Sequence, residues 1–269
     1  MHTKWVYFFF SMVIGAIFFS CNEDEIKNVA QTNNDSVKLT ALKNAIAKYP
    51  DSLLLTERII NYYRDKSEYD TAISIVNNAI KKDSNIAELW DIKATLHFEN
   101  EDTSNAIKAF ENAINIFPLP EYVIALGTLY AQTKNSKALT LANALQYADK
   151  GKAAKESFFI KGLYYNYAGD KKKAIAFFDS CLRLDYGYMF AYREKAIALY
   201  DEEKYEAALK VLSRAVTVQN NFDEGYYWIG NCYKKLNKKE EAIQSYHTAL
   251  LYDKNFTEAR DSLKTLEAK

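Results

Sequence analysis

Apolar side chains recur along most of this chain with helical spacing, and the pattern itself returns every 34 residues. In the first copy, for example, Ile73 and Val76 lie three residues apart in one apolar stripe. The frame needs no insertion over six copies, which start at Leu53, Ala87, Glu121, Lys155, Met189 and Asp223. A period of this length is typical of arrays of paired helices. The sequence therefore predicts two antiparallel helices in each copy.

Small residues occupy fixed places in this frame. With each copy numbered from 1 to 34, alanine stands at position 20 in five copies, as Ala72, Ala106, Ala174, Ala208 and Ala242. Position 27 is also small in five copies, namely Ala79, Ala113, Cys181, Ala215 and Ala249. Position 8 is small in four, namely Ala94, Gly162, Ala196 and Gly230. We expect helices to cross closely at these positions.

This pattern resembles the tetratricopeptide repeat, which has an aromatic residue at positions 4, 11 and 24 and small residues at positions 8, 20 and 27. The last copy matches nearly throughout, with Tyr226, Ile229, Gly230, Tyr233, Ala242, Tyr246 and Ala249. It lacks only the proline often found at position 32, where Lys254 stands. The resemblance implies an all-α fold, a right-handed superhelical solenoid of antiparallel helix pairs.

The third copy departs from the pattern. Gly127 and Tyr130 fall one place early, and Ala138 falls two places early. We expect a shortened turn between the two helices of this copy and a longer exit through Lys150 and Gly151. Such a change would alter the local curvature of the array.

The N-terminus has the features of an exported protein. An apolar run from Trp5 to Phe19 follows Lys4, and it is shorter than the roughly 20 residues that span a bilayer. Ser20 and Cys21 resemble a bacterial lipobox, although Phe18 stands where leucine is usual. We expect cleavage before Cys21 and lipid attachment to its thiol; the alternative is an uncleaved anchor with an incidental cysteine.

The frame and the N-terminal signal together give a domain organisation. The predicted segments are a signal peptide (1–20), a flexible tether (21–35), a capping half-repeat (36–52), six repeats (53–86, 87–120, 121–154, 155–188, 189–222 and 223–256) and a C-terminal capping helix (257–269). Caps are expected because a repeat at either end of an array cannot bury its apolar stripe alone.

Composition agrees with a helical protein and argues against some functions. The chain has 49% hydrophobic and 26% charged residues, and only 8 glycines and 3 prolines, which are the residues that interrupt helices. The formal net charge is +0, so the chain lacks the basic footprint of a nucleic-acid-binding protein. We expect no nucleic-acid partner.

Candidate catalytic or metal-binding groups are sparse. His2, His97 and His247 have no cysteine, histidine or carboxylate at a spacing that would form a metal site or a catalytic triad. Cys181 and Cys232 belong to different repeats, and stacked repeats would hold them too far apart for a disulfide, so we expect buried thiols. The sequence predicts no enzyme, no cofactor and no metal.

The resemblance places the concave binding face at first-helix positions 2, 5, 9, 12 and 13. In the later copies these positions are rich in aromatic residues and arginine, which supply binding hot spots. The candidate groove residues are Asn61, Arg64, Phe159, Asn166, Tyr167, Arg193, Tyr200, Tyr227, Asn231 and Lys234. The alternative is that these aromatic side chains simply pack against neighbouring repeats. The motif of the family members that clamp C-terminal carboxylates does not match, because Glu57 and Tyr227 stand where lysine is needed.

These features favour a membrane-anchored scaffold that binds envelope proteins or peptides through its groove. The alternative is a surface lipoprotein that takes part in glycan or nutrient capture for an outer-membrane transporter. The expected location is the cell envelope, with the lipid in the outer membrane. The acidic run NEDE after Cys21 resembles a surface-export signal but also suits a solubilising linker, so the periplasmic and surface faces both stay open.

Overall fold

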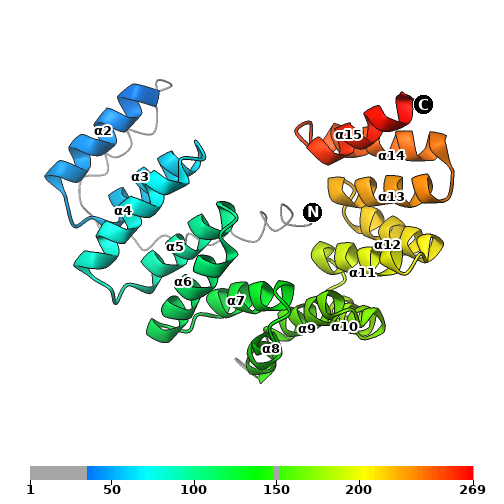
Figure 1. Cartoon of the computed structure of the whole chain (residues 1–269), viewed down its shortest axis with the longest axis horizontal. Coiled ribbons are helices and arrows are strands. Elements are labelled where there is room, and N and C mark those ends of the chain that lie inside the picture. Colours follow the sequence, from blue (N-terminus) through cyan, green and yellow to red (C-terminus); the bar gives the residue numbers. More distant parts are fainter. Residues whose placement is uncertain (1–34, 148–151, 269) are drawn as a thin grey trace. The chain divides into compact units, whose positions relative to one another are not determined.

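The computed structural model describes residues 35–147 and 152–268 of the chain. The predicted signal peptide, Cys21, nearly all of the predicted tether and the predicted exit through Lys150 and Gly151 lie outside these ranges. Within them every regular element is a helix, which confirms the all-α prediction (Figure 1). None of these helices combines the length and the apolar character that crossing a membrane requires.

The helices run in chain order as α2 (Asp35–Lys48), α3 (Leu53–Arg64), α4 (Tyr69–Lys82), α5 (Ala87–Glu99), α6 (Thr103–Ile116), α7 (Pro120–Gln132), α8 (Lys137–Tyr147), α9 (Ala154–Ala168), α10 (Lys171–Leu184), α11 (Met189–Asp201), α12 (Tyr205–Val218), α13 (Asp223–Lys235), α14 (Lys239–Tyr252) and α15 (Thr257–Glu267). The odd-numbered helices from α3 to α13 are the first helices of the six copies. Four of them begin at the residue where the sequence frame starts a copy, and α7 and α9 begin one residue earlier.

The chain divides into two compact units, residues 1–125 and 126–269, with the boundary inside α7. In unit 1 (residues 1–125), each helix from α2 to α6 packs on the next. Its core joins the apolar stripes of α3, α4 and α5, through Ile60, Ala72, Val76, Ile80, Leu89 and Leu96. Ala72 and Ala106 are fully buried, so the small residues at position 20 lie where two helices approach closely.

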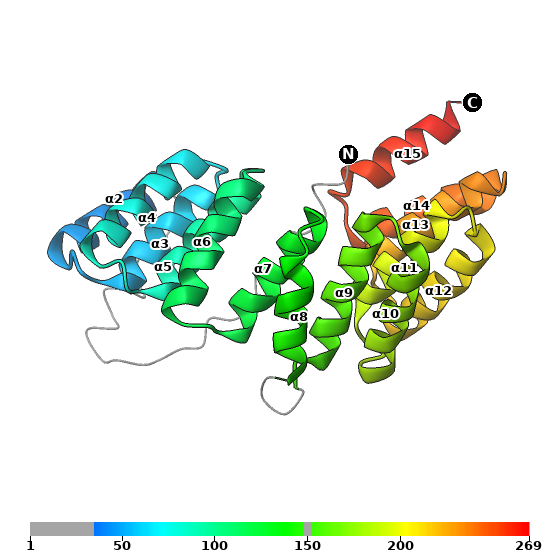
Figure 2. The ribbon, with the colours of Figure 1, turned by 60° about the horizontal axis from the view of Figure 1, so that its bottom comes forward.

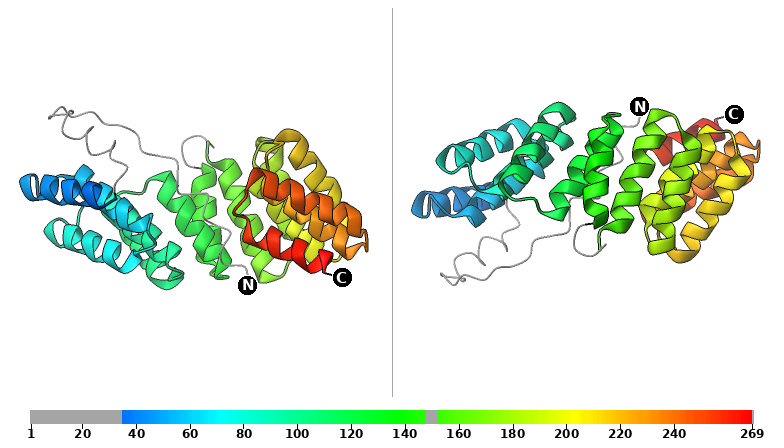
Figure 3. Two further views of the ribbon diagram at one scale, coloured as in Figure 1. Left: turned by 90° about the horizontal axis from the view of Figure 1, so that it is seen from above. Right: turned by 90° about the horizontal axis from the view of Figure 1, so that it is seen from below.

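In unit 2 (residues 126–269), the helices from α8 to α15 likewise pack in chain order (Figures 2 and 3). The first helices α9, α11 and α13 are also neighbours, because α11 contacts both of the others. At the C-terminal end, α15 buries Ala259 and Leu263 against α14 and leaves most of its polar residues exposed.

Two helix crossings in unit 2 pair a glycine at position 8 with an aromatic ring at position 24. A Cβ built on Gly162 would lie 2.5 Å from Phe178 Cε1, and one built on Gly230 would lie 2.6 Å from Tyr246 Cε1. Both rings are fully buried. The absence of a side chain at position 8 is therefore what lets the ring from the second helix lie against the first helix.

All six turns between the helices of a pair contain one residue in the left-handed conformation. These residues are Ser67, Glu101, Lys134, Gly169, Glu203 and Asn237. Each turn is closed by the same backbone hydrogen bond; for example, the Glu68 N–H donates to Tyr63 O over 2.9 Å. The shared geometry explains why the 34-residue period is kept so strictly.

The prediction of a shortened turn in the third copy was wrong. The stretch between α7 and α8, residues 133–136, is as long as the corresponding stretch 65–68 between α3 and α4. The turn keeps its left-handed Lys134 and its closing bond, in which Asn135 N–H donates to Tyr130 O over 2.8 Å.

We predict that Gly230→Ala destabilises the protein, because the new methyl group must displace the ring of Tyr246 from a filled core. Overpacking of this kind costs about 1–3 kcal/mol in the free energy of unfolding. Urea unfolding followed by circular dichroism measures the change. Gly187→Ala is the matched control, since Gly187 is exposed and its nearest contact is the flexible carboxylate of Asp185 at 3.3 Å. Equal midpoints for the two variants would contradict the prediction.

Candidate functional site

The predicted groove residues fall in both units. Asn61 and Arg64 are on α3 in unit 1, and the other eight are on α9, α11 and α13 in unit 2. Because α11 packs between α9 and α13, the structure brings those eight together on adjacent first helices (Figure 2). The two sets are therefore considered as separate surfaces.

Phe159 is not on a surface. Its side chain is 2% exposed and lies between the rings of Phe178 and Tyr188, with centroid distances of 6.0 and 5.3 Å. Tyr188 stands just before α11 and covers this part of α9. Phe159 is thus a core residue that joins two consecutive repeats, and its inclusion among exposed groove residues was wrong.

Arg193 is also buried, at 5% exposed. Its Nη1 donates to Glu224 Oε2 on α13 over 2.6 Å, and its Nε donates to Glu194 Oε1 over 3.1 Å. Burial alone would lower the pKa of Arg193, but the two carboxylates outweigh it and the pKa is raised. This side chain ties α11 to α13 and has no charge left over for a ligand.

Asn166 and Tyr167 lie in the last turn of α9. Asn166 is 7% exposed, and its Oδ1 accepts a hydrogen bond from Lys171 Nζ over 2.7 Å. Lys171 also pairs with Asp201 on α11 over 2.6 Å. Tyr167 is partly buried, and burial together with the charge of Glu194 raises its pKa to about 12. Both side chains thus belong largely to the contact between repeats.

The remaining predicted residues of unit 2 keep access to solvent: Tyr200, Tyr227, Asn231 and Lys234. The Tyr200 ring meets the edge of Trp228 at 5.4 Å and of Tyr205 at 5.2 Å. Tyr227 packs on Tyr246 and Phe256, at 5.9 and 5.1 Å between centroids, and Asn231 Oδ1 accepts from Tyr246 Oη over 2.8 Å. The Tyr200–Trp228 contact therefore joins two repeats, Tyr227 and Asn231 pack within their own repeat, and all four side chains still present part of their surface to solvent.

Trp228 is a member of this group that the sequence reasoning missed. It is partly exposed, its ring meets the edges of Tyr200 and Tyr227, and its buried Nε1–H has no hydrogen-bond partner among the described residues. It occupies position 6 of its copy, outside the positions assigned to the concave face, so only its residue type could have drawn attention to it. We name Tyr200, Tyr227, Trp228, Asn231 and Lys234 the aromatic face.

In unit 1, the Arg64 guanidinium forms two parallel hydrogen bonds with the Glu99 carboxylate on α5; the Nε–Oε2 distance is 2.7 Å. This pair links neighbouring first helices, as Arg193 and Glu224 do in unit 2. Asn61, one turn earlier on α3, is exposed. Both predicted groove arginines, Arg64 and Arg193, therefore link neighbouring repeats by ion pairs.

Unit 1 also carries a group of acidic residues that the sequence reasoning missed. The exposed Glu88 on α5 influences Glu57 on α3 and Asp91 on α5, while Glu121 and Tyr122 on α7 interact electrostatically with Asp91. Burial and the charges of Glu88 and Glu121 raise the pKa of Asp91 to about 7. Burial and the charge of Glu88 also raise the pKa of Glu57. We name these five residues the acidic face.

Groups suited to catalysis or metal binding do not converge in the part of the chain that the structure describes. No three residues of the His, Cys, Asp or Glu type lie there in positions to hold a metal ion. Cys181 and Cys232 are free and buried, as expected, and burial raises the pKa of each thiol to about 12, which makes them poor nucleophiles. His97 lies 3.3 Å from Asp102 at a turn, and burial lowers its pKa.

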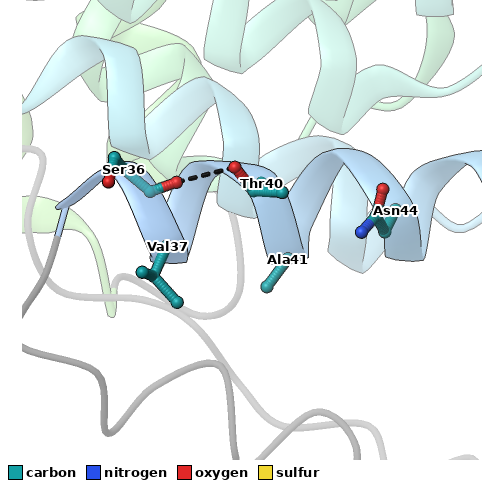
Figure 4. A pocket seen from close by; sticks show the side chains of 5 residues that line it. All are labelled: Ser36, Val37, Thr40, Ala41 and Asn44. Atoms are coloured by element: carbon teal, nitrogen blue, oxygen red, sulfur yellow. Dashed lines mark hydrogen bonds between the residues drawn. The ribbon is translucent and has the colours of Figure 1, made fainter.

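A hollow of about 360 Å³ lies on the surface of α2 (Figure 4). It is lined by Ser36, Val37, Thr40, Ala41 and Asn44, all on this one helix, and the Thr40 hydroxyl donates to Ser36 O over 2.8 Å. Its lining has no charged side chain, so it offers little to hold a ligand in a fixed orientation.

We predict that Asp91→Asn makes unfolding less dependent on pH. The folded protein keeps the Asp91 proton up to about pH 7, whereas an ordinary aspartate loses it near 3.8. Stability conferred by this proton is present at low pH and is lost as the pH rises through 7, by about 2 kcal/mol between pH 5 and 8. Urea unfolding at both pH values should show this loss reduced in Asp91→Asn. The exposed Asp65→Asn serves as control; the same pH dependence in all three proteins would contradict the prediction.

Comparison with known proteins gives family matches in several parts of the chain. Residues 87–118, 155–188 and 224–256 match models described as tetratricopeptide repeat, and residues 197–237 match one described as TPR repeat. The human Superkiller complex protein 3 is 25% identical over 199 residues, which are 71% of this chain and 13% of that protein. The chain therefore spans only a small part of this relative.

Solved structures show the same fold. A tetratricopeptide repeat protein from Parabacteroides merdae superimposes with a TM-score of 0.74 at 17% identity, over 91% of this chain and 98% of that one. Yeast Tom70 superimposes with a TM-score of 0.65 at 18% identity, over 88% of this chain and 50% of that one. At these identities the likeness concerns the fold alone.

Proposed function

The chain is a tetratricopeptide-repeat protein, a type of protein-interaction scaffold, and we propose that it is anchored to a membrane and binds envelope proteins or peptides. The aromatic face of unit 2 is the proposed binding surface. The observation that carries this proposal is the row of partly exposed aromatic rings, Tyr200, Trp228 and Tyr227, which crosses from α11 to α13.

Such rings are suited to bind a peptide because they bury much apolar area with little loss of side-chain entropy. They are already held by contacts with Tyr205, Tyr246 and Phe256, so binding would not have to order them. The exposed Lys234 offers a positive charge at the end of α13. A segment with apolar residues and a nearby carboxylate would match this surface.

The anchor is proposed from the sequence of the N-terminus. A diacylglycerol on Cys21, joined by a further acyl chain, would bind the membrane firmly because each buried methylene contributes about 0.8 kcal/mol. The proposed location is the cell envelope, at the outer membrane. The scaffold would then work on partners confined to the same membrane surface.

The binding proposal is tested with Tyr200→Ala combined with Lys234→Ala. After cross-linking in cells, we expect envelope proteins that co-purify with the unaltered chain to fall by about tenfold or more with this variant, the effect of losing one hot-spot ring. Tyr186→Ala combined with Lys254→Ala is the matched control, because both residues are exposed on the same unit but outside the aromatic face. Full capture by the test variant, or equal loss in both variants, would refute the proposal. Binding of the purified chain on a glycan array, instead of protein capture, would favour the glycan-capture alternative.

The anchor is tested separately with Cys21→Ser. We expect the variant to move from the membrane fraction to the soluble fraction of the cell envelope, because the thiol that carries the lipid is gone. Immunoblotting of the two fractions measures the shift, and Cys232→Ser controls for the loss of a cysteine elsewhere. A variant that stays in the membrane fraction would argue against lipid anchoring at Cys21.

A further inference from the structure

We propose that the hollow on α2 is covered by residues 22–31 of the same chain, which dock there as the first helix of a further repeat. Residues 22–31 lie outside the described ranges, and α2 follows them at Asp35. The proposal concerns the N-terminal end of the array, so it goes beyond the binding function proposed for the aromatic face. It rests on the place of α2 in the 34-residue frame, on the hollow and on the sequence of residues 22–31.

α2 has the place of a second helix whose first helix is not among the described elements. It ends at Lys48, which is position 30 of a copy that would start at residue 19. The second helices α4, α6, α10, α12 and α14 also end at position 30. Each of these five helices packs on the first helix of its own copy. We therefore expect α2 to carry a surface that fits a first helix.

The hollow lies at positions that a first helix covers in other copies. Its lining residues Ser36, Val37, Thr40, Ala41 and Asn44 stand at positions 18, 19, 22, 23 and 26. In the fourth copy, position 23 is Phe177, whose ring stacks on Phe158 and Tyr165 of α9 at 6.4 and 5.4 Å between centroids. On α2, by contrast, Val37 is 47% exposed, and it projects from the same side of the helix as Ala41 (Figure 4). A second helix presents such a surface when its first helix is not in place.

Residues 22–31 have the pattern of a short amphipathic helix. Val29 and Ala30 follow Ile26 by three and four residues, so the three side chains form one apolar stripe on a helix. The run NEDE before them starts with Asn22, a favourable N-cap residue, and has Glu25 three residues later, as in a capping box. Its carboxylates would also be stabilised by the positive end of the helix dipole. The acidic run is thus suited to begin a helix.

The apolar stripe also fits the hollow in size. In the fourth copy, Gly162 at position 8 admits the ring of Phe178 at position 24. In the copy that contains α2, the sizes are exchanged, because Ile26 stands at position 8 while α2 carries Ala41 at position 23 and Leu42 at position 24. A larger residue on the first helix therefore meets smaller residues on the second, which keeps the packing dense.

The link between residues 22–31 and α2 matches the turns of the other copies. The left-handed residue stands at position 15 in five of the six turns, and in the last copy it is Asn237. The same position before α2 is Asn33. Asparagine adopts the left-handed conformation more readily than most residues with a Cβ. Residues 32–34 can therefore form the short turn that a helix pair requires, and this observation is independent of the hollow.

The short link to α2 favours residues 22–31 over other occupants of the hollow. A binding segment on a short flexible linker has an effective concentration in the millimolar range. Even a weak contact is then enough for residues 22–31 to dock. A second copy of the chain, or a free polypeptide, would have to compete from a much lower concentration in solution.

Docking would change how the proposed anchor holds the array. An extended chain spans roughly 3.3–3.6 Å per residue, but a helix rises only about 1.5 Å per residue. With residues 22–31 docked as a helix, in place of the flexible tether expected for residues 21–35, a lipid on Cys21 would keep the first repeat close to the membrane. This consequence rests on the proposed anchor, whereas the docking of residues 22–31 does not.

The test places a thiol in the hollow with Ala41→Cys in the full chain, purified in detergent. Its reaction with N-ethylmaleimide is followed by mass spectrometry of the peptide that contains residue 41, so the other cysteines do not interfere. Adding Ile26→Asp puts a charge on the docking stripe and should make the reaction about tenfold faster, because the hollow opens. Asn28→Asp is the matched control: it lies opposite the stripe of the proposed helix and should leave the rate within about twofold.

Amide hydrogen exchange on the full chain without Ala41→Cys gives a second measurement. Residues 23–31 should exchange about tenfold more slowly than they do in the Ile26→Asp variant. Equal thiol reactivity with and without Ile26→Asp, or equal exchange in the two chains, would overturn the proposal. Protection that is lost when the protein is diluted would assign the hollow to a second copy and would also overturn it. Neither measurement uses a binding partner, so a negative result here leaves the proposed function of the aromatic face unaffected.

Discussion

The contact on which this structure depends is the crossing of two paired helices at a residue with little or no side chain. In unit 2 the rings of Phe178 and Tyr246 lie against Gly162 and Gly230 closely enough to exclude even a methyl group. Because the same positions recur in successive copies, the two helices of each copy pack against one another in a similar way. Dispersion contacts at such crossings are individually weak, but crossings at small residues recur along the array.

The array is joined along its length by charge as well as by packing. Arg64 and Arg193 reach carboxylates on the next first helix, and Lys155, Lys171 and Lys195 link neighbouring helices in unit 2. Leaving one member of a buried pair without the other is strongly unfavourable, so these pairs fix which side chains meet. They also consume polar groups that would otherwise serve as binding sites. What is left for partners is the chemistry that the fold does not use, namely the partly exposed rings of the aromatic face in unit 2.

Most of the fold could be predicted from the sequence because it depends on local spacing. The alanines at position 20, such as Ala72 and Ala106, predict close helix crossings, and both residues are fully buried in the structure. The site was harder, since exposure depends on side chains some thirty residues away. Tyr188 covers Phe159, and Glu224 reaches Arg193, and neither contact can be read from position numbers. The acidic face was within reach: Glu88 and Asp91 stand at positions 2 and 5, which the frame already placed beside Glu57.

The six turns with a left-handed residue affect the stability of the folded protein. Five of the six residues carry a Cβ, and the left-handed conformation costs such a residue roughly 1–2 kcal/mol. Glycine at these places would relieve that strain, although part of the gain would be offset by the greater freedom of glycine in the unfolded chain. Substitution at these five turn residues is therefore a way to raise the thermal stability of the protein. The aromatic face lies on α11 and α13 and not in these turns, so the protein could be stabilised without altering that surface.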